Sequence, residues 1–326
     1  MMNNDNLITA WSGLLRSSSE DVIRFIFTAP HRYKHYKIPK KTGGFRDIYH
    51  PTPELKAVQR WLNANIFSSL RIHDAVYSYR NGRSIKDHAS IHLSSNYFLR
   101  LDFKDFFPSI ELSWVEEFLR FNSNNNIIPC DLTTISTISH VVCRYSEKEK
   151  TNALSIGAPT SPILSNAILY DLDQAVSRLC SENDVIYSRY ADDIYLSTKH
   201  KNSLDRIGSD VLELVGKLVP MLQINQKKTI YSSRKRKVNI TGLNISTERN
   251  VSVGRELKRS VKTEFHLWCI GKLPNEKLTR LRGMISYVKG VEPSFFDALR
   301  NKFGAEKMES FLSLNIAPIE FVEIPF

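Results

Sequence analysis

The chain has 326 residues, of which 42% are hydrophobic and 24% charged, so it can bury a substantial core divided into two or three subdomains. It contains no run of 18 apolar residues, and its first residues lack the basic start and apolar core of a secretory signal. We therefore expect no membrane span and a cytoplasmic location. The four cysteines lack the paired short spacing of a zinc cluster or a disulfide framework.

The net charge of +11 is concentrated in one stretch of the chain. Residues 227–262 hold eleven basic and two acidic residues, which leaves a net charge of +2 for all other positions. A basic run is often only a solvated face. Because nearly all of the excess charge lies here, the pattern favours a polyanionic partner. Nucleic acid fits better than a membrane, since no amphipathic basic helix accompanies the run.

The first elements are a helix and a hairpin. A capping-box pattern at residues 17–20 predicts a helix through Phe27. Residues 40–50 predict two short strands around the turn Gly43–Gly44. Basic arms of this kind can fold over a phosphate chain, but an exposed turn with solvated charges is an equally good interpretation. The basic residues concerned are Lys40, Lys41 and Arg46.

The next elements are a core helix and a histidine pair. Residues 54–70 place apolar side chains on one stripe, which predicts a buried helix without chemistry. His88 and His92 are four apart and could bind zinc if helical. Without an accompanying cysteine or acidic ligand, polar packing or contact with RNA is the better interpretation, and we expect no zinc.

Residues 96–103 read as a strand that carries an acid. The alternation of period two places Leu99, Leu101 and Phe103 on one face and Arg100 and Asp102 on the other. Further along, residues 156–162 are rich in glycine, proline and small polar residues and precede a predicted helix that extends to residue 179. Such a helix start can offer N–H groups to an anionic or nucleotide ligand, or it can be a plain loop-to-helix transition.

Tyr190-Ala191-Asp192-Asp193 lies between two strand-like runs, residues 185–189 and 194–198, and predicts the tip of a hairpin. Aspartate in a turn is often only a turn device. If the strand of Asp102 lies beside this hairpin, however, three carboxylates converge and raise one another's pKa unless a cation neutralises them. Oxygen-only ligation suits magnesium, which takes substrate phosphates as further ligands.

The remaining residues predict a helix over 204–218, strands over 222–231 and 238–245, and a helical pattern from Glu256 onward. Thr241–Gly242 interrupts the second of these strands. No internal repeat or low-complexity linker is visible, so the segments are expected to be lobes of one body.

In this order the motifs resemble reverse transcriptases, most closely the bacterial retron enzymes, over roughly residues 30–290. The retron signatures Val-Thr-Gly and Asn-Ala-x-x-His are matched by residues 240–242 and 88–92, with Ile240 and His88 as substitutions, and Ile156 stands where many relatives place glutamine. The other matching motifs are Tyr190-Ala191-Asp192-Asp193, Asp102 with residues 106–109, residues 157–162, and residues 225–229.

The resemblance implies an α+β right-hand polymerase fold with fingers, a palm whose antiparallel sheet is backed by helices, and a helical thumb. We expect N-terminal helices and fingers over 1–95, the palm over 96–245 and a basic thumb over 246–326. The residues after Arg259 suffice for a thumb but not also for an RNase H domain, since a domain normally needs about 100 residues.

The resemblance also implies the chemistry of an RNA-directed DNA polymerase. Asp102, Asp192 and Asp193 are the expected catalytic and metal-binding residues for two Mg²⁺ ions, for which Mn²⁺ can substitute, and Lys228 is expected to protonate pyrophosphate. Phe107 matches the steric gate that selects dNTPs. The expected nucleotide-binding residues are Lys40, Lys41, Arg46, Phe107, Gly157, Pro159 and Thr160.

By the same resemblance the template is a cognate structured noncoding RNA of msr–msd type. It is copied into single-stranded DNA (msDNA) from an RNA 2′-OH, within an anti-phage defence system that includes an effector protein. An RNA-binding scaffold for an effector, or a group II intron or diversity-generating enzyme, is the alternative. The expected RNA-binding residues are His88, His92, Arg234, Lys235, Arg236, Lys237, Thr241, Gly242, Arg255, Lys258 and Arg259.

Overall fold

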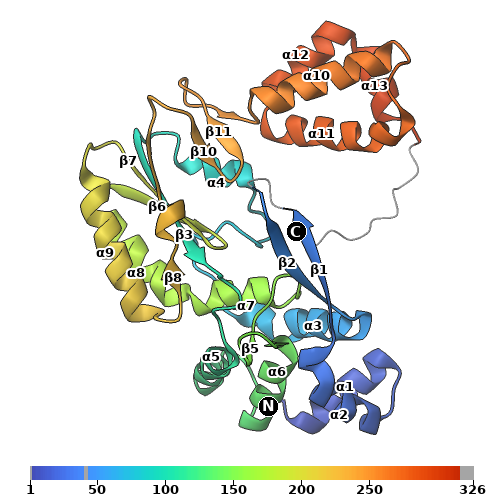
Figure 1. The fold of residues 1–326 in the computed structure, drawn as a ribbon, viewed down its shortest axis with the longest axis vertical. Coiled ribbons are helices and arrows are strands. Elements are labelled where there is room, and N and C mark those ends of the chain that lie inside the picture. Colours follow the sequence, from blue (N-terminus) through green and yellow to red (C-terminus); the bar gives the residue numbers. More distant parts are fainter. Residues whose placement is uncertain (1, 40–42, 316–326) are drawn as a thin grey trace. The chain divides into compact units, whose positions relative to one another are not determined.

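The computed structural model describes residues 2–39 and 43–315, which divide into two compact units (Figure 1). Within the described residues, unit 1 comprises 2–39, 43–81, 99–196 and 202–230, and unit 2 comprises 82–98, 197–201 and 231–315. Both units combine helices with antiparallel strand pairs, so the predicted α+β class is confirmed. In the described part of the chain, no helix combines the length and apolar character that crossing a membrane requires.

The main sheet has the strand order β6-β7-β3-β8, and β9 also pairs with β3. β3 has strand partners on both sides, and its apolar face is fully buried: Leu99, Leu101 and Phe103 are each at most 2% exposed. The predicted hairpin around residues 190–193 is formed by β6 and β7 and is confirmed. The strands are β3 (Tyr97–Lys104), β6 (Val185–Tyr190), β7 (Asp193–Thr198), β8 (Gln223–Ile224) and β9 (Ile230–Ser233).

Helices cover this sheet. Among these helices, α8 packs both against β6 and against α9. The predicted helix over 204–218 is α9, whose residues Leu204, Ile207, Val211 and Val215 recur at helical spacing and are buried. The helices are α7 (Ser161–Ile168), α8 (Tyr170–Ser181) and α9 (Ser203–Leu218).

A helical layer is formed by three helices that precede β3 in sequence and two that follow it, and in it α6 packs against α1, α2, α3 and α5. Trp11, fully buried, meets Trp61 edge to face with ring centroids 6.3 Å apart. The helix predicted from residues 17–20 is confirmed as α2, but the cap lies one residue later than predicted: Ser18 is the N-cap, and its side chain accepts the Asp21 N–H. The helices are α1 (Asn4–Leu15), α2 (Ser19–Thr28), α3 (Pro53–Asn65), α5 (Leu112–Asn124) and α6 (Leu132–Val142).

The predicted helix over 54–70 ends earlier than expected, at Asn65, and continues as the 3₁₀ turn η2 (Phe67–Ser69). Side chains compete with the helical hydrogen bonds here: Ser68 donates to the Ala64 carbonyl at 3.0 Å and Ser69 to the Ile66 carbonyl at 2.8 Å. The predicted apolar stripe is nonetheless buried along its whole length.

The predicted hairpin around Gly43–Gly44 is confirmed as β1 (Tyr33–Pro39) and β2 (Phe45–Pro51), paired antiparallel from Tyr33 opposite Pro51 to Pro39 opposite Phe45. Its first strand lies before residue 40, outside the range that we predicted. Gly43 and Gly44 have positive φ angles, which the turn requires. Lys40 and Lys41 lie outside the described residues. A second hairpin, β4 (Arg144–Ser146) with β5 (Thr151–Ala153), precedes the loop before α7.

The predicted strand over 222–231 is wrong as a continuous element. It is divided into β8 and β9 by the 3₁₀ turn η3 (Gln226–Lys228). The turn is tied to the central strand, because the Asn225 N–H donates to the Asp102 carbonyl at 2.7 Å.

In unit 2, the helix α4 (Ile85–Ile91) packs on a three-stranded sheet. The predicted interruption at Thr241–Gly242 is a tight turn with φ angles of 46° and 85°. Phe265 and Phe311 are fully buried in the helical bundle that follows. The strands are β10 (Val238–Ile240), β11 (Leu243–Ile245) and β12 (Val251–Ser252), and the bundle is α10 (Arg255–Cys269), α11 (Leu278–Val291), α12 (Pro293–Phe303) and α13 (Ala305–Leu312).

Candidate active site

Asp102 lies near the end of β3 and carries a buried carboxylate, 3% exposed. The Lys228 ammonium donates to both carboxylate oxygens, at 2.8 and 3.1 Å. Lys228 reaches this position because the turn η3 folds back onto β3. A buried charge requires such a partner, so the local fold supplies Asp102 with a cation of its own.

Asp192 lies in the turn between β6 and β7. Its backbone carbonyl accepts a hydrogen bond from the Phe103 N–H at 3.0 Å, which places the turn beside Asp102. Burial raises the pKa of Asp192, and the charge of Asp102 adds to the rise, whereas Lys228 and Arg46 oppose it. The structure thus brings the turn of Asp192 beside Asp102 on β3, as we expected from the sequence.

Asp193 begins β7 and has a partner of its own. The Arg100 Nε and Nη2 atoms donate to its two carboxylate oxygens, both at 2.9 Å. Burial raises the pKa of Asp193 to about 6, although Arg100 opposes the rise. Asp193 is therefore held in a bidentate ion pair with Arg100. Its role as a metal ligand stays a prediction.

Across the described ranges, no three His, Cys, Asp or Glu side chains are grouped in a way that could hold a metal ion. Mg²⁺ is commonly bound by one or two protein carboxylates that leave its other positions to water and substrate phosphates. Asp102 and Asp192 fit that demand, because both offer hard oxygen donors and Asp102 already binds the positively charged side chain of Lys228. The donor set suits Mg²⁺ that arrives with a nucleotide.

Two further residues surround Asp192. Arg46, on β2, is close enough for its charge to lower the pKa of Asp192. Tyr79 was not predicted. Although 45% of Tyr79 is exposed, desolvation of its hydroxyl raises its pKa to about 12, and Asp192 and Tyr190 add to the rise. Tyr79 also has a φ angle of 56°, uncommon for a residue with a side chain. Tyr79 belongs to none of the sequence motifs described above, so the sequence gives no signal for it.

The loop before α7 contains the predicted residues Gly157, Pro159 and Thr160. Gly157 has a φ angle of 111°, and a Cβ there would lie 2.7 Å from the Tyr49 carbonyl oxygen, so the position demands glycine. The Asn63 amide donates to the Pro159 carbonyl at 2.8 Å. Thr160 is fully buried, whereas Gly157 and Pro159 are partly exposed.

Phe107 lies in the bend after β3, five residues beyond Asp102. It is half-buried, and its ring centroid lies 5.2 Å from that of the buried Phe106. The neighbouring ring limits the movement of Phe107, which a steric gate requires.

The predicted RNA-binding residues lie in unit 2, and some of them are internal. His88 and His92 are fully buried; His88 Nδ1 is 3.2 Å from Thr241 Oγ1, and His92 Nδ1 is 2.7 Å from Ser197 Oγ. From these positions neither ring presents a group to RNA. His88 instead connects α4 with the turn of the β10–β11 hairpin, and His92 connects the end of α4 with β7.

The cationic RNA-binding candidates also divide into two groups. Arg234 donates to the carbonyls of Leu93 and Ser95, and Lys258 pairs with Glu292, so both have partners inside unit 2. The other candidates lie at the surface of the unit. The exposed cations are Lys235, Arg236, Lys237, Arg255 and Arg259; the uncharged candidate Gly242 is also exposed.

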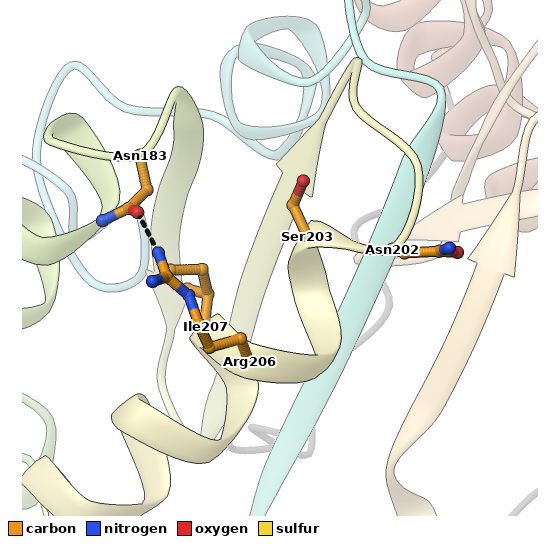
Figure 2. Close-up of a pocket in the computed structure, with 5 residues that line it drawn as sticks. All are labelled: Asn183, Asn202, Ser203, Arg206 and Ile207. Atoms are coloured by element: carbon orange, nitrogen blue, oxygen red, sulfur yellow. Dashed lines mark hydrogen bonds between the residues drawn. The ribbon is translucent and has the colours of Figure 1, made fainter.

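One pocket lies at the start of α9, with a volume of about 310 Å³. Figure 2 shows the hydrogen bond from Arg206 to Asn183 that lies along it. None of the residues predicted to bind substrate lines this pocket, so it is separate from the carboxylates. Its lining residues are Asn183, Asn202, Ser203, Arg206 and Ile207.

Comparison with known proteins decides the family. Residues 38–245 match the family described as reverse transcriptase (RNA-dependent DNA polymerase). The retron Ec83 reverse transcriptase of Escherichia coli is 34% identical over 285 residues, which cover 85% of this chain and 89% of that protein. The chain belongs to the bacterial retron reverse transcriptases. The Escherichia coli retron Ec73 enzyme is 31% identical and is matched over 92% of this chain and 95% of its own length.

Membership of the retron reverse transcriptases confirms the resemblance found in the sequence. It also assigns the right-hand polymerase fold and RNA-directed DNA polymerase activity. Among solved structures, telomerase from Candida albicans aligns with a TM-score of 0.46 at 13% identity, over 90% of this chain and 59% of that one.

Proposed function

We propose that this retron reverse transcriptase copies part of a cognate structured noncoding RNA into single-stranded DNA, the msDNA. Synthesis starts from an RNA 2′-OH, at a branching guanosine, and gives a covalent RNA–DNA product. The observation that carries the proposal is the position of the Asp192 turn beside Asp102 on β3, in a chain similar to named retron enzymes over most of its length.

Two Mg²⁺ ions held between Asp102 and Asp192 would activate the primer hydroxyl and stabilise the leaving pyrophosphate, and Mn²⁺ can take their place. The protein's part is to hold the two carboxylates and to move a proton. When metal and nucleotide enter, Lys228 gives up Asp102 and turns to the leaving pyrophosphate. Its side chain is 59% exposed, so it is free to make this movement and to donate a proton there.

The incoming dNTP is bound from the side of the β1–β2 hairpin. Arg46, with Lys40 and Lys41, neutralises the triphosphate, since phosphoryl transfer depends mainly on positioning and charge neutralisation. Support comes from Arg46, whose charge already acts on Asp192. The loop of Gly157, Pro159 and Thr160 supports the base, and Phe107 rejects a ribose 2′-OH.

RNA is recognised by the exposed cations of unit 2 and by the Thr241–Gly242 turn. Folded RNA is bound mainly through its shape, its phosphates and its 2′-OH groups, which suits flexible basic side chains. We assign His88, His92 and Arg234 an indirect part, because each has partners inside the protein. They fix the surface on which the exposed cations stand.

The test is the nucleic acid that copurifies with the enzyme. We expect a branched RNA–DNA species whose DNA portion resists ribonuclease and whose RNA portion does not. Asp102→Asn and Asp192→Asn variants should yield the RNA alone, because they lose a metal ligand and keep the basic surface. Asp205→Asn, an exposed carboxylate at the start of α9, is the matched control and should still give the branched product. DNA made in normal amounts by the Asp192→Asn variant would contradict the proposal.

We further propose that the complex acts with an effector protein in anti-phage defence in the cytoplasm. A host carrying the intact system should resist phage, and the Asp192→Asn variant should not. Continued protection by that variant would favour the alternative function, an RNA-binding scaffold for the effector that needs no catalysis.

A further inference from the structure

The turn that carries Asp192 is held in an unusual backbone conformation. Ala191 has a φ angle of 54°, in the left-handed region that residues other than glycine rarely adopt. Such a conformation persists only when surrounding contacts impose it. Two buried side chains supply those contacts, one for the N–H and one for the carbonyl of Ala191.

The first contact comes from Ser78. Its hydroxyl oxygen accepts the Ala191 N–H at 2.8 Å, and the residue is fully buried. The segment before Ser78 lies along β6, because the Arg189 N–H donates to the Ala75 carbonyl at 2.9 Å. The Asn166 amide in turn donates to the Ser78 carbonyl at 3.0 Å. Ser78 is thus fixed on both sides and presents its oxygen to the turn.

The second contact comes from Arg189, whose Nη1 donates to the Ala191 carbonyl at 3.1 Å. Its Nε and Nη2 atoms donate to the two oxygens of Asp173 at 2.8 and 2.7 Å, and both residues are fully buried. A buried ion pair contributes little to stability against an apolar replacement, because desolvation offsets the attraction. The ion pair does, however, fix the orientation of the Arg189 guanidinium. Through its bond to the Ala191 carbonyl, the guanidinium in turn restrains the turn.

The next residue is held as well, since the Phe103 N–H donates to the Asp192 carbonyl. The backbone on both sides of the Asp192 side chain is therefore fixed by named donors and acceptors. We propose that Ser78 and Arg189 are positioning residues that aim the Asp192 carboxylate at the site it shares with Asp102. This inference rests on the proposed function, because the aim matters only if Asp192 binds the metal.

The first test replaces Ser78 by alanine and uses Ser123→Ala as the matched control. Ser123 is also buried and also bonds a backbone group, the Cys130 carbonyl at 2.5 Å, but it lies on α5. Two quantities are measured: the affinity for Mn²⁺ by electron paramagnetic resonance, without turnover, and the single-turnover rate of dNTP incorporation. Thermal unfolding shows whether the two variants lose comparable stability.

We expect Ser78→Ala to bind Mn²⁺ several-fold more weakly and to incorporate dNTP about 10- to 100-fold more slowly than Ser123→Ala, since small misplacements of reacting groups are costly. Equal Mn²⁺ affinities and rates in the two variants would overturn the proposal. If the unmodified protein makes no DNA, the proposed function fails, but the Mn²⁺ measurement still decides whether Ser78 positions Asp192.

Arg189→Lys provides an independent test. Lysine keeps the positive charge beside Asp173 but lacks the planar fork that reaches Asp173 and the Ala191 carbonyl together. We expect weaker Mn²⁺ binding in this variant also, with the primer–template affinity unchanged. Wild-type Mn²⁺ affinity in folded Arg189→Lys protein would remove Arg189 from the proposal.

Discussion

The Lys228 ammonium bridges both oxygens of Asp102, at 2.8 and 3.1 Å, although 126 positions separate the two residues. The protein thus neutralises its buried carboxylate in the place where the proposed metal ion would bind. Under the proposed function, Lys228 would compete with the metal in the free enzyme and donate a proton during the reaction. These two roles change activity and metal affinity in opposite directions.

Replacing Lys228 with glutamine should therefore raise the affinity for Mn²⁺ and lower the rate of incorporation. The loss of a general acid costs about 10²- to 10⁴-fold in rate. Metal binding is measured by electron paramagnetic resonance and the rate by single-turnover kinetics at saturating dNTP. Lys227→Gln, the exposed neighbour in the same 3₁₀ turn, should change neither. A Lys228→Gln enzyme with the normal rate would exclude the proton-donor role.

The ion pair of Arg100 and Asp193 predicts a pH effect. Burial raises the pKa of Asp193 to about 6 even though Arg100 opposes the rise. Below that pH the carboxyl takes up a proton and loses its charge, so activity should fall as the pH decreases through about 6. Arg100→Gln removes the opposing charge, raises the pKa of Asp193 further and moves this acid limb to higher pH.

The measurement is the pH profile of kcat/KM for dNTP. Arg120→Gln is the control, since Arg120 pairs with Glu116 on the surface of α5. A profile that Arg100→Gln leaves in place would show that Asp193 does not determine the acid limb.

Gly157 and Gly216 predict opposite effects of the same substitution. Alanine at 157 would meet the Tyr49 carbonyl oxygen at 2.7 Å in a positive-φ conformation, which should cost about 1–3 kcal/mol and displace the nucleotide loop. Gly216, within α9, has no atom within 4 Å of the added methyl group, so alanine there should gain about 0.5–1 kcal/mol. Urea unfolding gives both values. A higher KM for dNTP is expected only for Gly157→Ala.

Phe107→Ala should relax the selection against ribonucleotides. Removal of the ring leaves room for a 2′-OH, and discrimination of this kind is worth roughly 100-fold. The ratio of kcat/KM for dNTP and rNTP measures it. Phe121→Ala, which removes an exposed ring on α5, should leave the ratio unchanged. If Phe107→Ala also leaves it unchanged, another residue is the gate.

The sequence predicts the carboxylate hairpin well because the information is local. Strands flank residues 190–193 on both sides, and their β-branched and aromatic residues alternate with the period of a strand. The same holds for the Gly43–Gly44 hairpin and for the turn at Thr241–Gly242. In each case the turn residues lie between the two strands in the sequence, so the whole hairpin can be predicted from one short stretch.

Other parts of the site depend on contacts that no local pattern contains. Lys228 reaches Asp102 only because residues 226–228 form a 3₁₀ turn in place of the predicted strand. This turn begins directly after Asn225, whose N–H donates to the Asp102 carbonyl on β3. Arg189 gives the opposite case: arginine is a residue type expected at the surface, yet its partner Asp173 makes full burial possible. Periodicity identifies faces of elements, not which distant elements meet.

The buried histidines of unit 2 give the last prediction. Burial lowers the pKa of both His88 and His92 to about 3, well below the value of about 6.5 in an unfolded chain. Between these values the unfolded chain binds protons that the folded chain does not. Stability is therefore fully present above pH 6.5 and decreases as the pH falls towards 3, by up to about 1.4 kcal/mol per pH unit for each histidine.

A His88→Asn/His92→Gln variant should be less stable at pH 7, because the bond to Ser197 is lost, but it should lose less stability between pH 7 and pH 5. Urea unfolding at several pH values within that range measures both effects. His200→Gln, an exposed histidine after β7, is the control and should retain the full pH dependence. If the double variant also retained it, the two rings would not be the groups that couple protonation to the folding of unit 2.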